Sequence, residues 1–249
     1  MTYCVGIRVR EGLAMLADTR TNAGVDNIST YRKLRLFGND GERLIMIASA
    51  GSLSTTQAAL QRLTHGIMHP ETGQLETLQT VPDIFSAALA VGRAIRTSRD
   101  TLEGLAQADI NFNSTFLVGG SIKGEPTRLF LVYSAGNAIE CHADTPYLQI
   151  GENKYGKPIL DRALDYEMPL SEAVKLALIS FDSTIRSNLA VGLPIDLAVA
   201  PDRTSTAVAR RIEADDPYFT DLSHRWSTAL ASALGTIPPP PYASEEAQG

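Results

Sequence analysis

The residue that follows the first methionine, Thr2, carries a side chain that could act as a nucleophile. Methionine aminopeptidases remove an initiating methionine when the next residue is small, and threonine qualifies. The chain would then carry an α-amine and a hydroxyl on one residue. An α-amine has a pKa of about 7.7–8, so a useful fraction is neutral at pH 7 and can accept a proton. Because an adjacent amine can activate a threonine hydroxyl, Thr2 is a candidate nucleophile with its own base.

The residues behind Thr2 predict a β-hairpin that returns a carboxylate to it. Residues 3–9 alternate in the period of a half-buried strand. Glu11 and Gly12 make the turn, and residues 13–17 form a second, more continuously apolar strand. Asp18, at the end of that strand, is therefore expected beside Thr2.

A lysine and a glycine on the next two predicted strands complete a candidate active site. Lys33 lies in YRKLRLF, a predicted strand over residues 31–37 that could cross the same end of the hairpin. A lysine there would favour deprotonation of the amine and hydroxyl of Thr2, and Asp18 would keep it charged and aimed. The buried strand LIMIASAG ends at Gly51 before a helix start, where backbone N–H groups can stabilise an oxyanion.

Composition excludes several other classes of protein. The 249 residues suit one α/β-type domain, and the net charge of −6 without a Lys/Arg run argues against nucleic-acid binding. No apolar stretch approaches a membrane span, and Arg8 and Arg10 interrupt the first strand where a signal peptide would be continuously apolar. Two cysteines predict a cytoplasmic protein with reduced thiols. No metal-ligand spacing is present among the histidines, so we expect no metal and no cofactor.

The order of the predicted elements indicates an α+β fold. Strands come in hairpins, so the sheets should be mainly antiparallel, stacked between two helical layers. Predicted helices begin at Ser52, at Thr80 as a capping residue, near Ile159 and at Ser171, and a last helix covers residues 217–234 and stops at Gly235. We expect one domain over residues 1–235 and a proline-rich, mobile tail over residues 236–249.

The segments TYCVGIRVREGLAMLADTRTNAG, YRKLRLF and ASAGSLSTTQ together resemble the start of a proteasome β-type subunit. The absence of a propeptide, the segment FDSTIRSNLAVGLPIDLAV and the C-terminal extension resemble the Anbu (ancestral beta subunit) branch of that family. The resemblance implies an N-terminal-nucleophile (Ntn) hydrolase with a four-layer αββα sandwich. It also implies peptidase-type chemistry on a peptide or protein substrate, and self-assembly into rings or ring-like arrays.

The same resemblance assigns roles to individual residues. Thr2 matches the nucleophile, Asp18 and Lys33 the supporting pair, and Gly51 the oxyanion glycine. Two further residues match positions near the substrate. Arg20 is the arginine two residues after the aspartate, and Asn22 stands where the family has a small hydroxyl residue that binds the substrate backbone.

The late part of the catalytic pattern departs from the family. Ser187 matches a serine near the amine, Thr184 replaces its acidic partner, and Asp182 could substitute for it. A solvent-facing position or a helix cap would explain Asp182 and Ser187 equally well. GENKYG stands where proteasomal members have a serine-containing turn.

These features predict a threonine hydrolase that forms an acyl-enzyme. Two alternatives stay open: a self-assembling scaffold with little turnover, and an Ntn amidase acting on a small amide. The altered GENKYG and STIRSN segments favour the scaffold. The sequence does not identify the substrate, or whether an unfoldase binds.

Overall fold

The structure of the protein is a computed structural model that describes residues 1–22, 28–104 and 110–243. The chain divides into two compact units, residues 1–214 and residues 215–249. The first unit contains two five-stranded sheets, and every strand pair in the described part of the chain is antiparallel.

The sheet that contains the N-terminal hairpin has the order β12-β1-β2-β13-β14. Its strands are β1 (Tyr3–Val9), β2 (Gly12–Asp18), β12 (Tyr147–Gly151), β13 (Ile195–Pro201) and β14 (Val208–Ile212). The second sheet has the order β11-β10-β9-β6-β5. Its strands are β5 (Leu34–Gly38), β6 (Arg43–Gly51), β9 (Ser114–Ile122), β10 (Arg128–Val132) and β11 (Ala138–Glu140).

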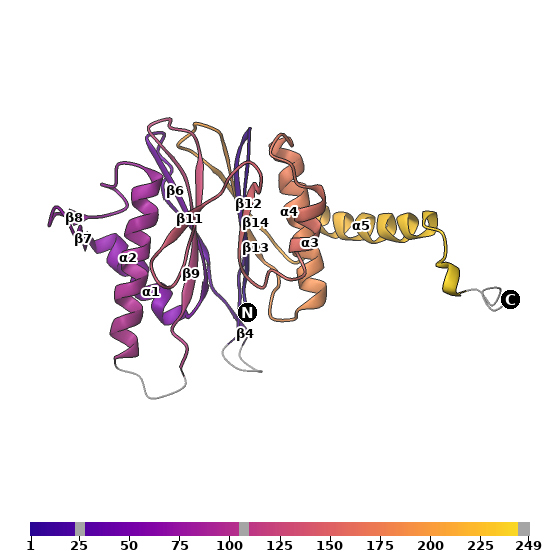
Figure 1. Ribbon diagram of the computed structural model, residues 1–249, viewed down its shortest axis with the longest axis horizontal. Coiled ribbons are helices and arrows are strands. Elements are labelled where there is room, and N and C mark those ends of the chain that lie inside the picture. The colour runs from indigo at the N-terminus through magenta and orange to yellow at the C-terminus, as the bar shows by residue number, and fades with distance from the viewer. Residues whose placement is uncertain (23–27, 105–109, 244–249) are drawn as a thin grey trace. The chain divides into compact units, whose positions relative to one another are not determined.

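Helices cover the outer faces of both sheets, so that the layers follow the order α, β, β, α (Figure 1). Helices α1 (Leu53–His65) and α2 (Ile84–Glu103) pack on the second sheet, against β6, β9 and β10. Helix α4 (Leu170–Ser187) packs on β1 and β2, and the short α3 (Lys157–Ala163) packs on α4. The predicted α+β, four-layer, mainly antiparallel sandwich is confirmed.

The core lies in the layers on either side of the second sheet. Alternate residues of β6 point to different layers: Ile45 and Ile47 pack with α1 and α2, whereas Leu44 and Met46 pack between the sheets. A strand buried on both faces needs a continuous apolar sequence, which explains LIMIASA. Each such side chain stabilises the fold by about 1.5–3 kcal/mol when it is fully buried.

Several element boundaries differ from the predictions. Helix α2 begins after Asp83, whose carboxylate accepts a hydrogen bond from Ser86 N at 2.7 Å. Thr80 instead accepts from Thr77 N within a turn. Helix α4 begins at Leu170, one residue before the predicted cap, and Leu170 N donates to Glu11 Oε2 at 2.8 Å. That carboxylate belongs to the distant β1–β2 turn, so local sequence does not indicate it.

Several strands lie outside the segments in which the sequence predicts strands. The polar segment after Asp18 contains β3 (Arg20–Asn22) and β4 (Ile28–Thr30), which pair with each other. The strand predicted over residues 31–37 begins only at Leu34. The short strands β7 (Ile67–Met68) and β8 (Leu75–Glu76) also pair with each other. Strand β14 occupies ARRI, because its arginines line a sheet edge that remains exposed.

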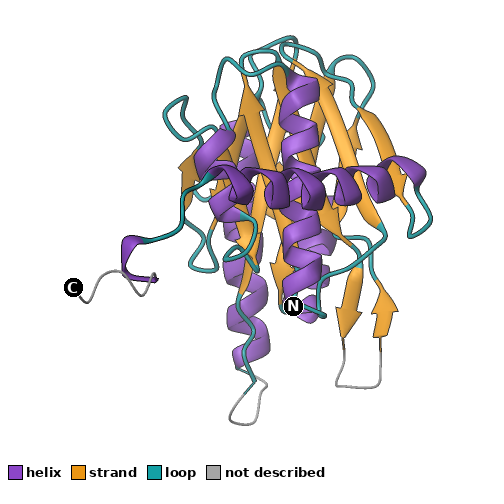
Figure 2. Cartoon of the chain, turned by 90° about the vertical axis from the view of Figure 1, so that its right-hand side faces the viewer, coloured by secondary structure: helices purple, strands orange, loops and turns teal. Residues whose placement is uncertain are grey.

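The second unit consists of helix α5 (Pro217–Thr236) and a short 3₁₀ helix (Pro241–Ala243). Figure 2 shows α5 as one unbroken helix. The Asp216 carboxylate caps it by accepting from Phe219 N at 2.8 Å. Helix α5 continues through Gly235, so the predicted stop at that glycine is wrong.

Two expectations about the organisation of the chain stay predictions. They are the single domain over residues 1–235 and the mobile tail, of which residues 244–249 lie outside the described residues. Of the helices described, none is both long enough and apolar enough to span a membrane.

Candidate active site

The N-terminal hairpin places Asp18 directly behind Thr2. In the β1–β2 ladder Cys4 lies opposite Ala17, so the next residues along each strand, Tyr3 and Asp18, meet at the end of the hairpin. Tyr3 N donates to Asp18 Oδ1 at 3.0 Å. The backbone that leads to Thr2 is therefore tied to the Asp18 carboxylate.

Asp18 and Lys33 form a buried ion pair that joins the two sheets. Lys33 Nζ lies 2.7 Å from Asp18 Oδ1 and donates a second hydrogen bond to Arg20 O at 2.6 Å. The side chain of Asp18 is fully buried and that of Lys33 is 6% exposed. Burial raises the pKa of the Asp18 carboxyl, while the charge and hydrogen bond of Lys33 act in the opposite direction. The ion pair and the hydrogen bond to Arg20 O hold Lys33 in place.

Thr2 is half-buried, and backbone contacts from the neighbouring strand hold it. Its carbonyl oxygen accepts a hydrogen bond from Glu152 N at 2.6 Å. Gly151, the last residue of β12, has φ of +83°, and a Cβ there would lie 1.9 Å from Thr2 O. A glycine at this position therefore allows β12 to approach Thr2 closely.

Thr2 and Lys33 line one small cavity with Gly51, and its volume is about 40 Å³. The other residues around it are Thr21, Tyr31, Ser49, Ala50, Leu53 and Thr56. Gly51 ends β6 with φ of +111°, and a Cβ there would lie 2.3 Å from Asn113 O. The next residue, Ser52, caps α1 through a hydrogen bond from Thr55 N, so a helix N-terminus adjoins the cavity. Four of the predicted site residues thus lie together: Thr2, Asp18, Lys33 and Gly51.

The other predicted site residues lie elsewhere or are only partly described. Arg20 Nη1 donates to Leu189 O at 2.7 Å, so the side chain binds the loop after α4. The backbone of Asn22 ends β3, but its side chain lies outside the described residues. Asp182 is buried in α4 and accepts from Arg186, and Ser187 is the exposed last residue of that helix. Arg20, Asp182 and Ser187 are not among the described residues that line the cavity at Thr2.

Glu152 and Asn188 surround the N-terminus, although the sequence did not single them out. Glu152 is buried, and its Oε2 accepts from Asn188 Nδ2 at 3.0 Å. Asn188 Nδ2 also lies 3.8 Å from the sulfur of Met1, which is itself exposed. The sequence held a partial signal for both residues. Glu152 belongs to the GENKYG turn, which diverges from the family, and Asn188 directly follows the candidate Ser187.

Thr21 also escaped prediction as a site residue. Its Oγ1 is buried and has no hydrogen-bond partner in the described part of the chain, and the residue lines the cavity next to Thr2. A buried hydroxyl normally has a partner. Thr21 is therefore available to a ligand at this site. Residues 1–22, 28–104 and 110–243 contain no cluster of three His, Cys, Asp or Glu side chains arranged for a metal ion.

Comparisons with known proteins identify the family. No protein-family model matches the chain. Two curated relatives, each named proteasome subunit beta 2, come from Pyrobaculum neutrophilum and Pyrobaculum calidifontis. They are 26% and 27% identical over 198 and 196 residues, which cover 78% of this chain and 86% of each relative.

Solved structures are more similar. An Anbu (ancestral beta-subunit) protein from Yersinia bercovieri is 45% identical with a TM-score of 0.86, and the match covers 96% of this chain and 99% of that one. The chain belongs to the Anbu family. An Anbu from Hyphomicrobium sp. strain MC1 is 47% identical with a TM-score of 0.86, covering 95% and 98% of the two chains. The Anbu complex of Pseudomonas aeruginosa, described as a helical assembly, is 40% identical with a TM-score of 0.85, covering 98% and 100%.

Membership of the Anbu family confirms the resemblance to proteasome β-type subunits. It also shows that the sandwich of this Anbu chain is the fold of a proteasome-like Ntn hydrolase. In that fold, the cavity at Thr2 lies at one end of the paired sheets, where β1, β2 and β6 bring Thr2, Asp18 and Gly51 together.

Proposed function

We propose that this Anbu chain is a threonine hydrolase of peptidase type, in which Thr2 becomes the first residue and acts as the nucleophile. One observation carries the proposal: the buried Asp18–Lys33 pair lies beside Thr2, and Lys33, Thr2 and Gly51 line one cavity. A buried ion pair adds little net stability to a fold, because desolvation of both charges offsets their attraction. Its position next to a possible nucleophile favours a role in chemistry.

The first half of the reaction forms an acyl-enzyme. The free α-amine of Thr2 takes the proton from the Thr2 hydroxyl, whose oxygen attacks the carbonyl carbon of the substrate amide. The backbone N–H of Gly51 donates to the oxygen that becomes negative. The C–N bond then breaks, and the leaving amine takes the proton that the α-amine holds.

The second half releases the acid. Water attacks the ester carbonyl while the same α-amine takes its proton. The bond to Thr2 Oγ breaks, and this oxygen recovers the proton from the α-ammonium. The enzyme returns to its starting state, and the substrate amide has become a carboxylic acid and an amine.

Charged residues around Thr2 adjust the pKa of its hydroxyl and of its α-amine. The Lys33 ammonium lowers the pKa of the hydroxyl and of the amine, and Asp18 keeps Lys33 aimed at them. The buried Glu152 carboxylate, held by Asn188, opposes this effect on the amine side, because a negative charge stabilises the ammonium form.

Covalent labelling tests the mechanism. The purified chain is first examined by intact mass to establish that Thr2 is the N-terminal residue, and is then treated with a peptide vinyl sulfone. We expect one adduct on Thr2 and none on Thr2→Ala. Lys33→Ala should react at least tenfold more slowly, because the hydroxyl loses the neighbouring positive charge. Equal labelling of Thr2→Ala would refute the assignment, and an unreactive wild type with a free Thr2 would favour the scaffold alternative.

The size of the cavity favours a second candidate, an amidase that acts on a small amide. About 40 Å³ is small beside the roughly 300–1,000 Å³ of typical ligand pockets. A small acyl group next to the scissile bond suits such a space. A panel of acyl amides that differ only in this group, from glycine to phenylalanine, tests the candidate. We expect kcat/KM to fall as the side chain grows, whereas a peptidase with a larger pocket would prefer the larger members.

We further propose that the chain forms homo-oligomers, as rings or ring-like arrays. The support is the 40% identical Pseudomonas aeruginosa Anbu complex, which is described as a helical assembly. Native mass spectrometry and electron microscopy of the purified protein test this. Monomers at micromolar concentration would contradict it.

A further inference from the structure

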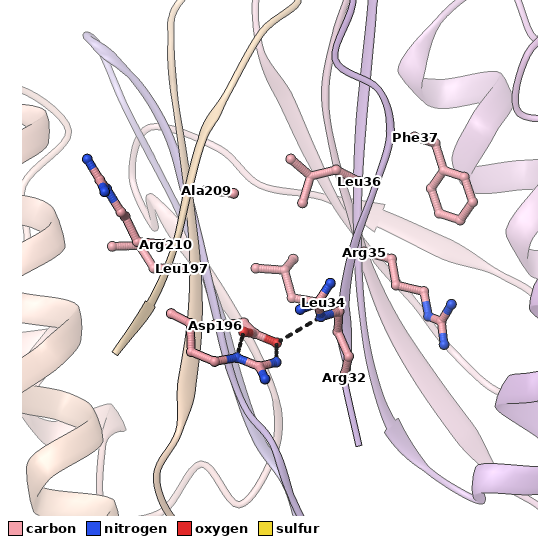
Figure 3. Close-up of a pocket in the computed structure, with 10 residues that line it drawn as sticks. Arg32, Leu34, Arg35, Leu36, Phe37, Asp196, Leu197, Ala209 and Arg210 are labelled. Carbon is pink, nitrogen blue, oxygen red and sulfur yellow. Dashed lines mark hydrogen bonds and ion pairs between the residues drawn. The ribbon is translucent and has the colours of Figure 1, made fainter. Parts of the chain in front are cut away.

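A cleft of about 500 Å³ opens between the last strands of the two sheets, and none of the residues that line it also lines the cavity at Thr2. Strand β5 ends one sheet and β14 ends the other, so each has a sheet neighbour on one side only. Figure 3 shows the two strands on opposite sides of the cleft. The volume lies within the range of pockets that bind ligands, about 300–1,000 Å³.

The inner walls of the cleft are apolar. Leu34 and Leu36 of β5 belong to the faces that pack between the sheets. They point toward β14, where Ala209 faces them (Figure 3). Arg35 and Arg210 lie on the opposite faces of their strands and point away from the cleft interior, one at each lip (Figure 3).

One end of the cleft is charged. Asp196, on β13, accepts from Arg211 Nε at 2.7 Å and from Arg211 Nη2 at 2.9 Å, and Arg32 Nε lies 3.8 Å away. Arg32 and Arg211 lie with Asp196 at this end of the cleft, whereas Arg35 and Arg210 stand at its lips and point outward. The arginines in and around the cleft outnumber its one aspartate, which favours acidic groups there.

The edge of β14 offers backbone groups as well as charge. Residues 208–211 of this five-residue strand are exposed, and β13 is its only strand neighbour in the described sheet. An exposed edge presents N–H and C=O groups to which another strand can hydrogen-bond. Because successive side chains alternate, Arg210 and Arg211 place one guanidinium on each face of that edge.

We propose that the β14 edge of this cleft binds an extended, acidic segment of a partner polypeptide by β-strand addition. The segment hydrogen-bonds to the β14 backbone and places apolar side chains between Leu36 and Ala209. An inward carboxylate meets Arg32 and Arg211, and an outward one meets Arg210. The apolar wall, the charged end and the free strand edge select this occupant only in combination. A small anion would use the charge alone, and a neutral peptide would use the wall and the edge alone.

Fluorescence anisotropy tests the proposal on the full chain, in a Thr2→Ala background so that hydrolysis cannot remove the probe. The probe is a capped, labelled heptapeptide that alternates valine and glutamate and ends in two glutamates. We expect saturable binding that weakens as salt increases. Two control peptides separate the contributions: lysines in place of the glutamates remove the charge match, and a central proline removes a backbone donor.

The decisive variant is Arg210→Glu, because Arg210 is exposed and outside the core. We expect it to weaken binding at least tenfold, as loss of one charge-assisted hydrogen bond implies. Arg162→Glu makes the same charge change at an exposed position outside the cleft and should bind as the parent does.

Three results would overturn the proposal. They are no binding at millimolar peptide, equal binding by both charge-reversal variants, and equal binding of the proline peptide. If sedimentation shows that Arg210→Glu changes the oligomer while the peptide never binds, then a second copy of the chain covers this edge and the proposed partner is wrong.

Discussion

Removal of the Lys33 charge tests whether Asp18 is held as a buried anion. In the variant Lys33→Met, the fully buried Asp18 carboxylate loses the ammonium that lies 2.7 Å away. Loss of one partner of a buried pair typically costs about 3–5 kcal/mol, because it leaves an unpaired charge in the interior. Asp18 can escape part of that cost by taking up a proton, and the stability loss should therefore depend on pH.

The sign of the pH dependence follows from the pKa of Asp18. Burial already raises this pKa in the wild type, and loss of Lys33 removes the main opposing influence, so the folded-state pKa rises further above the unfolded value of about 3.9. A raised folded-state pKa means that the folded protein binds more protons than the unfolded chain. Stability then falls as the pH rises from about 4 through the folded-state pKa, by about 1.4 kcal/mol for each pH unit that separates the folded and unfolded values.

Urea unfolding of Lys33→Met and wild type, followed by circular dichroism at pH 4.5 and 7.5 and at one protein concentration, measures the effect. We expect the difference in unfolding free energy to be larger at pH 7.5 than at pH 4.5. The double variant Lys33→Met/Asp18→Asn should recover much of the loss at pH 7.5, because the amide carries no charge and its oxygen can still accept from Tyr3 N. A loss that is independent of pH, or a double variant as unstable as Lys33→Met, would refute the argument.

Other contacts in the structure lead to three more expected outcomes. Glu152→Gln removes a negative charge near the Thr2 amine, so the pKa of that amine should fall. The acidic limb of the kcat/KM profile should then move to lower pH. An unchanged profile would show that Glu152 does not influence the amine. Burial raises the pKa of the Cys141 thiol to about 12, above the unfolded value of about 8.5. Stability should therefore be lost as pH rises from about 8.5 toward 12, and Ellman's reagent at pH 8 should label this cysteine only in denaturant; rapid labelling of the native protein would contradict its burial. Glu11→Ala removes the distant cap of α4 and should reduce the free energy of unfolding by about 1 kcal/mol, measured in urea, whereas Glu11→Gln should retain most of it.

Local patterns in the sequence were sufficient for much of the fold. The alternation over residues 3–9, the glycine turn and the apolar run before Asp18 predict a hairpin, and β1 and β2 form it. Ser52 before a helical pattern predicts the start of α1, and its hydroxyl caps that helix. In each case the determining contacts join residues a few positions apart, or residues opposite each other in one hairpin.

Local sequence patterns did not predict the contacts of the residues at the end of α4. The resemblance points to Ser187, whereas the structure places its neighbour Asn188 against Glu152. One residue of offset at a helix end turns a side chain by about 100°. The sequence shows a polar run there, but the packing of α4 on β1 and β2 decides which residue of the run contacts Glu152.

By itself, the sequence determined the hairpins, the helical segments, the stacked-sheet class and the candidate residues Thr2, Asp18, Lys33 and Gly51, because these depend on periodicity and on short-range turns. Only the tertiary structure decided which distant groups meet. Glu152 is 36 positions from Asn188, Glu11 is 159 positions from the helix that it caps, and the cleft depends on two strands at the free edges of different sheets. Such contacts follow from the order in which strands pair and sheets stack. That order minimises the free energy of the whole chain and leaves little trace in any single segment.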